Sequence, residues 1–330
     1  MLSRVADSIY WMNRYFERAE NVARFVDVNH HLLLDLPERE ADAWAAVLAT
    51  TGDSALFRER YGTPTRESVL RFLTWDRDYP NSIVSCLRAA RENARQVREV
   101  ISSELWEQVN RTYLTVKEAS PEEVLDTPTD FYASVKQASQ LFVGIHYLTM
   151  THNEAWHFGR MGRLIERADK TSRIVDVKYY ALPHDDEEVR SVAEEIHWGA
   201  LLKSASGFEM YRKRFGLITP AHAVEFLLLD PKFPRAVEYC VLKAERSLHA
   251  ITGAPLGCTD TQAELKALDL RLHIEQMDIQ SVLATGVHAA VDQIQARLNQ
   301  LGTGVYETFF AVRAIAPSVS PPMMQWQRQS

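Results

Sequence analysis

The chain has 330 residues, of which 46% are hydrophobic and 25% charged, and this is the composition of a globular protein with a sizeable core. Its formal net charge of −7 argues against a general affinity for nucleic acid, because phosphate binding needs a concentrated positive field. The three cysteines, Cys86, Cys240 and Cys258, are far apart in the chain. This spacing argues against a disulfide framework and against a thiolate zinc site.

The first twenty residues are interrupted by charges every few positions, unlike the apolar region of a secretory signal. No stretch of the chain approaches the ~20 uninterrupted apolar residues that a membrane-spanning helix requires. We therefore expect a cytoplasmic protein. Glycine and proline number only 13 each, which favours long helices over many turns.

Apolar residues recur at spacings of three and four from Val5 to Val26, and this periodicity predicts a helix over 3–36 that ends before Pro37. No segment alternates with a period of two for long enough to indicate a strand. The last fifteen residues are proline-rich and are expected to be loose. Further helices are predicted over 40–51, 66–75, 80–113, 128–152, 155–181, 186–203, 220–229, 234–252, 260–300 and 303–315.

The chain also repeats itself. The segment NRYFERAENVARFVDV from Asn13 matches GRLIERADKTSRIVDV from Gly162 at an offset of 149 residues. The match continues at an offset of 154, where Trp44 meets Trp198 and Cys86 meets Cys240. Aromatic, glycine, proline and cysteine matches in one continuous order are hard to produce by chance.

The repeat predicts an all-α helical bundle made of two tandem units related by a pseudo-twofold axis. We place the first unit at residues 1–150, the second at 151–316 packed on the first, and a flexible tail at 317–330.

Charged residues form a matched stripe on the first helix of each unit. At 100° per residue, Arg14, Glu17, Asn21 and Arg24 share one face, flanked by Glu20 and Asp27. Solvated ion pairs on a helix have little reason to recur in both halves of a chain. The matches therefore indicate a semi-buried network in which guanidinium groups bind carboxylates. Such a network joins the two units or lines a cleft for an acidic ligand, and we favour the joining role.

A second basic stripe lies further along the first unit. Arg88, Arg91, Arg95 and Arg98 share one helix face, with Glu92 and Glu99 four residues after two of them. The plainer interpretation is a solvated, locally paired face. The functional interpretation is a groove for a carboxylate or phosphate, with Glu104 and Trp106 on the same helix.

Known catalytic motifs are largely missing from the sequence. A carboxylate-bridged metal site in a helical bundle needs two Glu-x-x-His motifs, and Glu154 to His157 supplies one. Glu245 and His249 are spaced i, i+4, which is usable but common by chance. Cys86 and Cys240 lie in apolar helical patterns and are interpreted as core residues. His30, His31 and His152 are interpreted as forming local hydrogen bonds. We predict no bound metal and no cofactor.

Three segments resemble a known family. MLSRVADSIYWMNRYFERAEN, ARENARQVREVISSELWEQVN and TMTHNEAWHFGRMGRLIERAD are similar to the bacterial alpha-E domain family, and the likeness extends from Met1 to about Ala316. The resemblance implies an all-helical fold. It also implies a setting beside, or fused to, ATP-grasp ligase-like proteins and transglutaminase-like peptidases, which would form or trim amide bonds on a peptide.

These observations lead to one hypothesis and two alternatives. The leading hypothesis is a non-catalytic helical partner subunit that docks a ligase-like enzyme or presents its peptide substrate. The alternatives are an enzyme of amide-bond formation or cleavage, with Glu17 or Glu166 as acid or base, and a metal-dependent helical-bundle enzyme. The candidate residues for ligand binding or ion pairing between the units are Arg14, Glu17, Arg18, Glu20, Arg24, Asp27, Arg91, Asn93, Arg95, Glu104, Trp106, Arg163, Glu166, Arg167, Asp169, Arg173 and Asp176.

Overall fold

The computed structural model describes residues 1–35, 40–180 and 190–311, and this part of the chain is helical with no strand. The prediction of an all-α fold is confirmed. The expected stop at Pro37, residues 186–189 of one predicted helix, and the 317–330 tail lie outside the described residues. The helices are α1 (Ser3–Asp35), α2 (Glu40–Thr51), α3 (Ser54–Tyr61), α4 (Arg66–Thr74), α5 (Ile83–Gln96), α6 (Ser103–Glu118), α7 (Pro121–Asp126), α8 (Pro128–Thr149), α9 (Glu154–Tyr180), α10 (Arg190–Ser204), α11 (Phe208–Phe215), α12 (Pro220–Leu229), α13 (Val237–Thr252), α14 (Gln262–Glu275), α15 (Ile279–Thr285) and α16 (Val287–Val305).

Two predicted helices are wrong in extent. The helix expected over 80–113 is two helices, because a turn follows Val97 and Ser102 caps α6 by accepting from the Leu105 N–H. The helix expected over 260–300 is three. Asp278 forms a capping box at the start of α15, and Gly286 adopts a φ of 95° before α16, a conformation that favours glycine.

Smaller differences occur elsewhere. The short helices α3, α7 and α11 were not expected from the sequence. The helix expected over 303–315 is the end of α16 followed by a π-helical turn, Tyr306–Phe310, and its last residues lie outside the described part. Short helices of six to eight residues carry too little periodicity to be recognised from a pattern.

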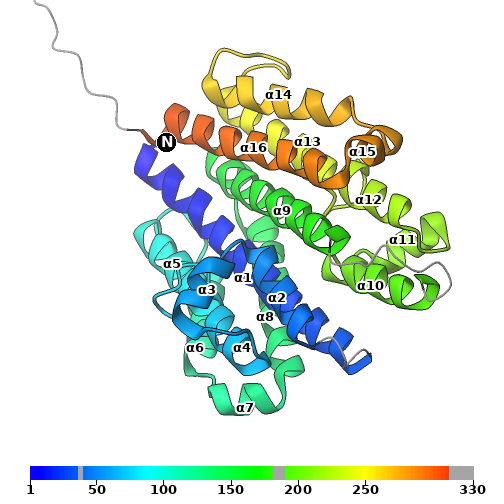
Figure 1. Ribbon diagram of the computed structural model, residues 1–330. Coiled ribbons are helices and arrows are strands. Elements are labelled where there is room, and N and C mark those ends of the chain that lie inside the picture. Colours follow the sequence, from blue (N-terminus) through cyan, green and yellow to red (C-terminus); the bar gives the residue numbers. More distant parts are fainter. Residues whose placement is uncertain (36–39, 181–189, 312–330) are drawn as a thin grey trace, which may run out of the picture.

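The first helix of each predicted unit lies at the centre of the molecule. Helices α1 and α9 run side by side in Figure 1, and contacts from Met1 to Glu154 and from Arg18 to Glu166 show that they point the same way. Their backbones approach closely at Gly162, where an added Cβ would lie 2.6 Å from the Tyr10 carbonyl oxygen. Only glycine permits this approach.

The packing around the central pair is matched. Helix α1 packs against α5 and α8, and α9 packs against α13 and α16. Helix α6 bridges α5 and α8, just as α14 bridges α13 and α16. The helix that follows each central helix in the chain also packs against the opposite central helix. Helix α2, which follows α1, packs against α9, and α10, which follows α9, packs against α1. The duplication and the boundaries of the two units stay a prediction, with which this matched packing is consistent.

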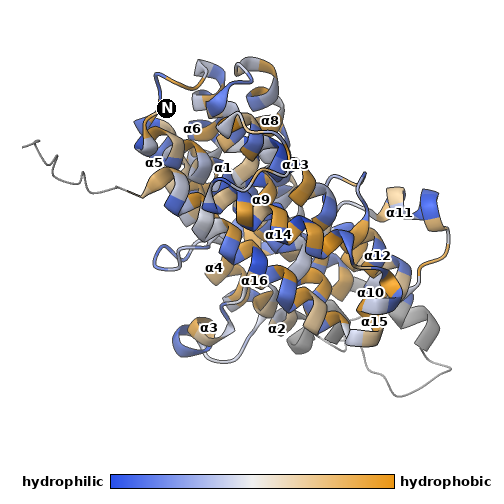
Figure 2. Cartoon of the chain, turned by 90° about the horizontal axis from the view of Figure 1, so that it is seen from above, coloured by the Kyte–Doolittle hydropathy of each residue, from blue (hydrophilic) through white to orange (hydrophobic). Residues whose placement is uncertain are grey.

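The core extends through both halves. Trp44 and Trp198 are buried, as are Cys86 and Cys240, whose thiols face the carbonyls of Pro80 and Pro234 at 3.6 and 3.5 Å. Figure 2 shows hydrophobic and hydrophilic residues sharing most helices, the pattern of amphipathic helices around a common core. Helix α1 departs from this rule, because its charged stripe is buried as well.

Candidate functional site

Two glutamates, one from each central helix, are buried between α1 and α9. Glu17 is 2% exposed and Glu166 is 0% exposed. Carboxylates are rarely so deeply buried without a partner, because removing their charge from water is costly. Their partners therefore decide what this part of the molecule does.

Each glutamate is bound by an arginine of the opposite central helix. Arg18 on α1 binds Glu166 on α9 with two hydrogen bonds, Nε to Oε1 at 2.6 Å and Nη2 to Oε2 at 2.9 Å. Arg167 on α9 binds Glu17 on α1 in the same way, with both bonds at 2.8 Å. In each consecutive Glu-Arg pair, therefore, the glutamate binds the arginine of the opposite helix, and the arginine binds the glutamate of the opposite helix. Bidentate pairs of this kind are strong and fix geometry.

The exchange is not fully symmetric. Arg14 is a second cation at Glu166 and adds a third hydrogen bond, with Nε at 2.9 Å from Oε2. Its sequence match, Arg163, does not bind Glu17, and its buried Nε and Nη1 lack a hydrogen-bond partner among the described residues. Arg235, from the loop before α13, takes that place and contacts both Glu17 and Glu20.

A second layer of ion pairs lies one turn further along each central helix. Arg24 binds Glu20 and Ser206, and Arg173 binds Asp169. Lys170 lies 3.1 Å from Asp169 and 3.9 Å from Glu166. We call the whole set the central network: Arg14, Glu17, Arg18, Glu20, Arg24, Arg163, Glu166, Arg167, Asp169, Lys170, Arg173 and Arg235.

The surrounding charges decide the protonation of this network. Burial alone would raise the pKa of Glu20, but Arg235 and Arg24 outweigh it and lower that pKa to about 2. Burial also opposes ionisation of Glu17 and Glu166, and their arginine partners again hold both pKa values below the usual range. Arg163 is the contrast, since burial and the neighbouring Arg167 lower its pKa to about 10.

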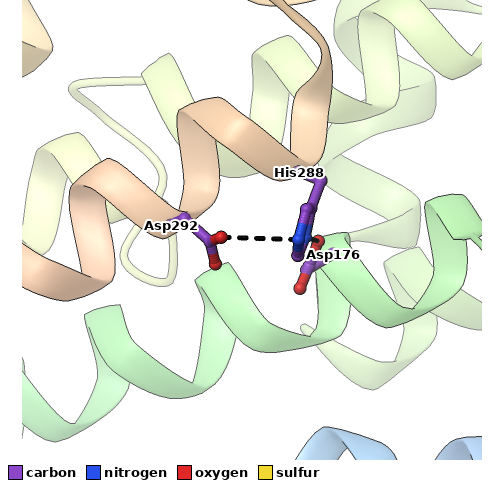
Figure 3. Close-up of side chains that lie close together, drawn as sticks. All are labelled: Asp176, His288 and Asp292. Carbon is purple, nitrogen blue, oxygen red and sulfur yellow. Dashed lines mark hydrogen bonds and ion pairs between the residues drawn. The ribbon is translucent and has the colours of Figure 1, made fainter.

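Asp27 and Asp176, the last matched acids, bind different cations. Lys136 of α8 binds Asp27, whereas His288 of α16 binds Asp176, with Nδ1 2.7 Å from Oδ1. The other ring nitrogen of His288 lies 3.4 Å from Asp292, as Figure 3 shows. The hydrogen bond with Asp176 raises the pKa of His288.

The ligand atoms of Asp176, His288 and Asp292 lie within 4.8 Å of one another, close enough to hold a metal ion. Both ring nitrogens of His288 face a carboxylate, however, and only one of them could bind the same ion. The arrangement therefore fits a protonated imidazole between two carboxylates better than a metal centre.

The remaining predicted residues form a separate surface group on α5 and α6. Arg91 donates to Asn110 at 2.7 Å and to Glu92 at 3.0 Å, and Arg95 also binds Glu92. Arg91 and Arg98 both lie over the Trp106 ring, at 5.8 and 4.9 Å from its centroid. We call the set Arg91, Arg95, Arg98 and Trp106 the α5–α6 face. Trp106 belongs to the next helix rather than to that of Arg91, which corrects the predicted groove along one helix.

Two further predicted residues of this region have local roles. Asn93 donates to the Ala89 carbonyl one turn earlier in α5, at 3.0 Å. Glu104 lies in the first turn of α6, where its charge suits the helix dipole, and accepts from the Ser103 hydroxyl at 3.3 Å.

The other residues considered for catalysis or metal binding each have a local partner or a buried position that does not suit that role. Glu154 binds the terminal amino group of Met1 at 2.8 Å, and Glu245 binds Arg271. Burial raises the pKa of the Cys86 and Cys240 thiols to about 12, so neither thiol ionises readily near neutral pH. His31 bonds to the Asp27 carbonyl, and His152 to the Tyr147 carbonyl.

The sequence analysis missed several contributors to these contacts: Asn81, Asn110, Lys136, Lys170, Ser206, Arg235 and His288. Arg235 directly follows the matched Phe-Pro pair that precedes α13, so its place in the repeat was available as a signal. Its match at the offset of 154 is Asn81, which accepts from Arg18 at 2.7 Å. The two residues differ in type, and an analysis that looked for identical residues could not select them.

Comparison with known proteins defines the class to which this helical arrangement belongs. The sequence model of the Alpha-E family, described as a predicted alpha-helical domain with a conserved ER motif, matches residues 1–310. The chain therefore belongs to the Alpha-E family. No solved structure matches it.

The chain is similar to uncharacterised proteins of Mycobacterium bovis and Mycobacterium tuberculosis. Each is 23% identical over 343 aligned residues, which cover 97% of this chain but 38% of the relative. The chain thus spans less than two fifths of the length of the curated relatives it matches. Across the part that the structure describes, no helix is both long and apolar enough to span a bilayer.

Proposed function

We propose that this chain is a non-catalytic helical partner subunit of a cytoplasmic peptide-modifying system, in which an ATP-grasp ligase-like protein and a transglutaminase-like peptidase form or trim amide bonds. In this proposal the chain docks the ligase-like protein or presents its peptide. The observation that carries the proposal is the length of the relatives, in which the same region is 38% of a longer chain. A region that belongs to a longer chain in its relatives is suited to act as a separate subunit beside another protein.

The α5–α6 face supports this proposal as the docking surface. Arg95 and Arg98 are exposed on a chain whose net charge is negative, and Trp106 lies beneath Arg98. Arginine and tryptophan are enriched among the residues that dominate binding energy at protein interfaces. Such a face fits an acidic peptide segment or a carboxylate of the partner.

The central network supports a joining role and argues against catalysis. Its carboxylates are buried, each is held by arginine, and their pKa values are lowered. A carboxylate with a strongly lowered pKa is a poor proton acceptor, and one that stays ionised cannot serve as a general acid. We infer that Glu17-Arg18 and Glu166-Arg167 are the Glu-Arg motif in the family's description, selected because the exchange braces α1 against α9.

The direct test is co-purification of the chain with the ATP-grasp ligase-like protein of the same genome. We expect a complex that weakens at least about tenfold in the double variant Arg95→Glu, Arg98→Glu, since charge reversal at a complementary face costs several kcal/mol. Arg58→Glu, an exposed reversal on α3, is the matched control and should leave binding unchanged. No association over a wide concentration range would refute the proposal.

The enzyme alternatives are open to separate tests. Turnover of candidate peptides by the purified chain, lost in Glu166→Gln while the fold is retained, would favour catalysis by the central network. Metal retained by the wild type but not by Asp176→Asn would favour a metal-dependent enzyme, and the Asp176–His288–Asp292 group is the observation that motivates this test.

A further inference from the structure

A second feature of the molecule, separate from the α5–α6 face, is a cavity of about 520 Å³. It lies beside the C-terminal half of α1, and α8, α10 and α11 supply its other walls. This volume falls within the range of small-molecule and peptide pockets, ~300–1,000 Å³. The lining is mixed, because charged residues from three helices face it together with an apolar wall.

The charged part of the lining holds an incomplete contact. Asp27 is 6% exposed and lines the cavity, and Lys136 binds one of its carboxylate oxygens. The other oxygen, Oδ1, is buried and has no hydrogen-bond partner among the described residues. The imidazole of His31 lies nearby, with Nδ1 3.6 Å from Oδ1, but it donates to the Asp27 carbonyl instead. A buried carboxylate oxygen without a donor is costly, and a donor from a ligand would remove that cost.

The rest of the lining has the shape of a binding site for a small amphipathic group. Val28, Leu32, Ile196, Phe208 and Ile218 form the apolar wall. Lys203 stands over the Phe208 ring, 5.4 Å from its centroid, and makes no ion pair within the described residues. The cavity thus combines an acceptor in need of a donor, an apolar wall and an available ammonium group.

We propose that this cavity binds an α-amino group that is followed by an apolar side chain, with Asp27 Oδ1 accepting from the ammonium, the apolar wall holding the side chain, and Lys203 contacting a carboxylate or carbonyl further along. A free amino acid and the amino terminus of a peptide share this chemistry. The proposal concerns a different surface from the docking face and stands if that face binds nothing.

Calorimetric titration of the full chain with the dipeptide Leu-Ala tests the site. N-acetyl-Leu-Ala is the ligand control, because acetylation removes the ammonium and leaves the apolar side chain. We expect the acetylated peptide and the Asp27→Asn variant to weaken binding by about tenfold or more, the usual cost of losing a hydrogen bond to a charged group.

Gly199 provides a matched pair of variants that do not touch Asp27. A Cβ at Gly199 would lie 3.5 Å from the Phe208 ring and 3.9 Å from Ile218, both ordinary contacts. Gly199→Ala should therefore bind as the wild type does, whereas Gly199→Leu should fill the cavity and abolish binding. This comparison remains informative if Asp27→Asn fails to fold.

Free leucine, as a third ligand, separates the two sources. Binding as tight as that of the dipeptide indicates a free amino acid, and binding of the dipeptide alone indicates a peptide terminus. Equal binding of acetylated and free peptide, unchanged binding in Gly199→Leu, or no binding of either amino-group ligand by the wild type would each overturn the proposal.

Discussion

The two ends of the central network reach the same result with different residues. At one end Glu166 is held by Arg18 and Arg14, which both come from α1. At the other end Glu17 is held by Arg167 of α9 and by Arg235 from outside the central pair. Both ends have a bidentate arginine–glutamate pair between α1 and α9, but the second arginine that supports each glutamate comes from a different part of the chain. Arg163, displaced by Arg235, is left without the carboxylate that its sequence match binds.

The largest expected effect is loss of a shared carboxylate. Glu166→Ala strands Arg14 and Arg18 in a buried site, and we expect the free energy of unfolding to fall by roughly 3–5 kcal/mol. Glu17→Ala should cost a similar amount because it strands Arg167, although Arg235 keeps its contacts with Glu20. Chemical denaturation measures both.

An exposed ion pair supplies the control for these variants. Glu67→Ala removes one of the two carboxylate partners of Arg71 on α4, where both side chains are exposed, and should cost at most about 1 kcal/mol. Equal losses at Glu166 and Glu67 would mean that the central network does not brace the helices.

The next effect separates the two ends. Arg14→Met removes a hydrogen-bonded cation from Glu166 and should cost about 1.5–3 kcal/mol. Arg163→Met removes a cation whose pKa burial and Arg167 already lower, so this variant should be neutral or stabilising. Thermal denaturation of the two variants side by side gives the comparison, and equal destabilisation would contradict the asymmetry.

Acid should weaken both ends. The pKa of Glu20 falls from 4.5 to about 2 in the folded chain, so the unfolded chain binds more protons between these values. Its contribution to stability is therefore complete above pH 4.5 and is lost as the pH falls toward 2. Urea denaturation between pH 5 and 2.5 should show this decline. Glu20→Gln should flatten it, and an unchanged slope would count against the arginine contacts.

The smallest effect concerns Asp176 and its histidine. His288 has a raised pKa, so its contribution is complete below the unfolded value of 6.5 and is lost as the pH rises through the folded value. His288 is largely exposed, so His288→Asn should change the melting temperature only slightly, and more at pH 6 than at pH 8.

The sequence predicted the buried ion pairs between α1 and α9 where charged residues repeat, and it did not predict contacts of residues that have no matching residue in the other half. Matched charges predicted that Glu17 and Glu166 would lie in a paired, semi-buried network, because buried charge restricts which residues can replace it. The bend after Val97 was missed because residues 97–102 contain no glycine or proline and keep a helical composition. Arg235 and Lys136 were missed because contacts between distant segments depend on how helices pack, which a pattern within one helix does not encode.

Where α1 and α9 approach most closely, Tyr10 and Asn13 of α1 lie over Gly162 and Gly159 of α9, and the repeat pairs Tyr10 with Gly159 and Asn13 with Gly162. A homodimer built from either half would set bulk against bulk or leave a void on both sides. At this contact the two predicted units are therefore complementary to each other, and a copy of the same unit would not fit in the same way.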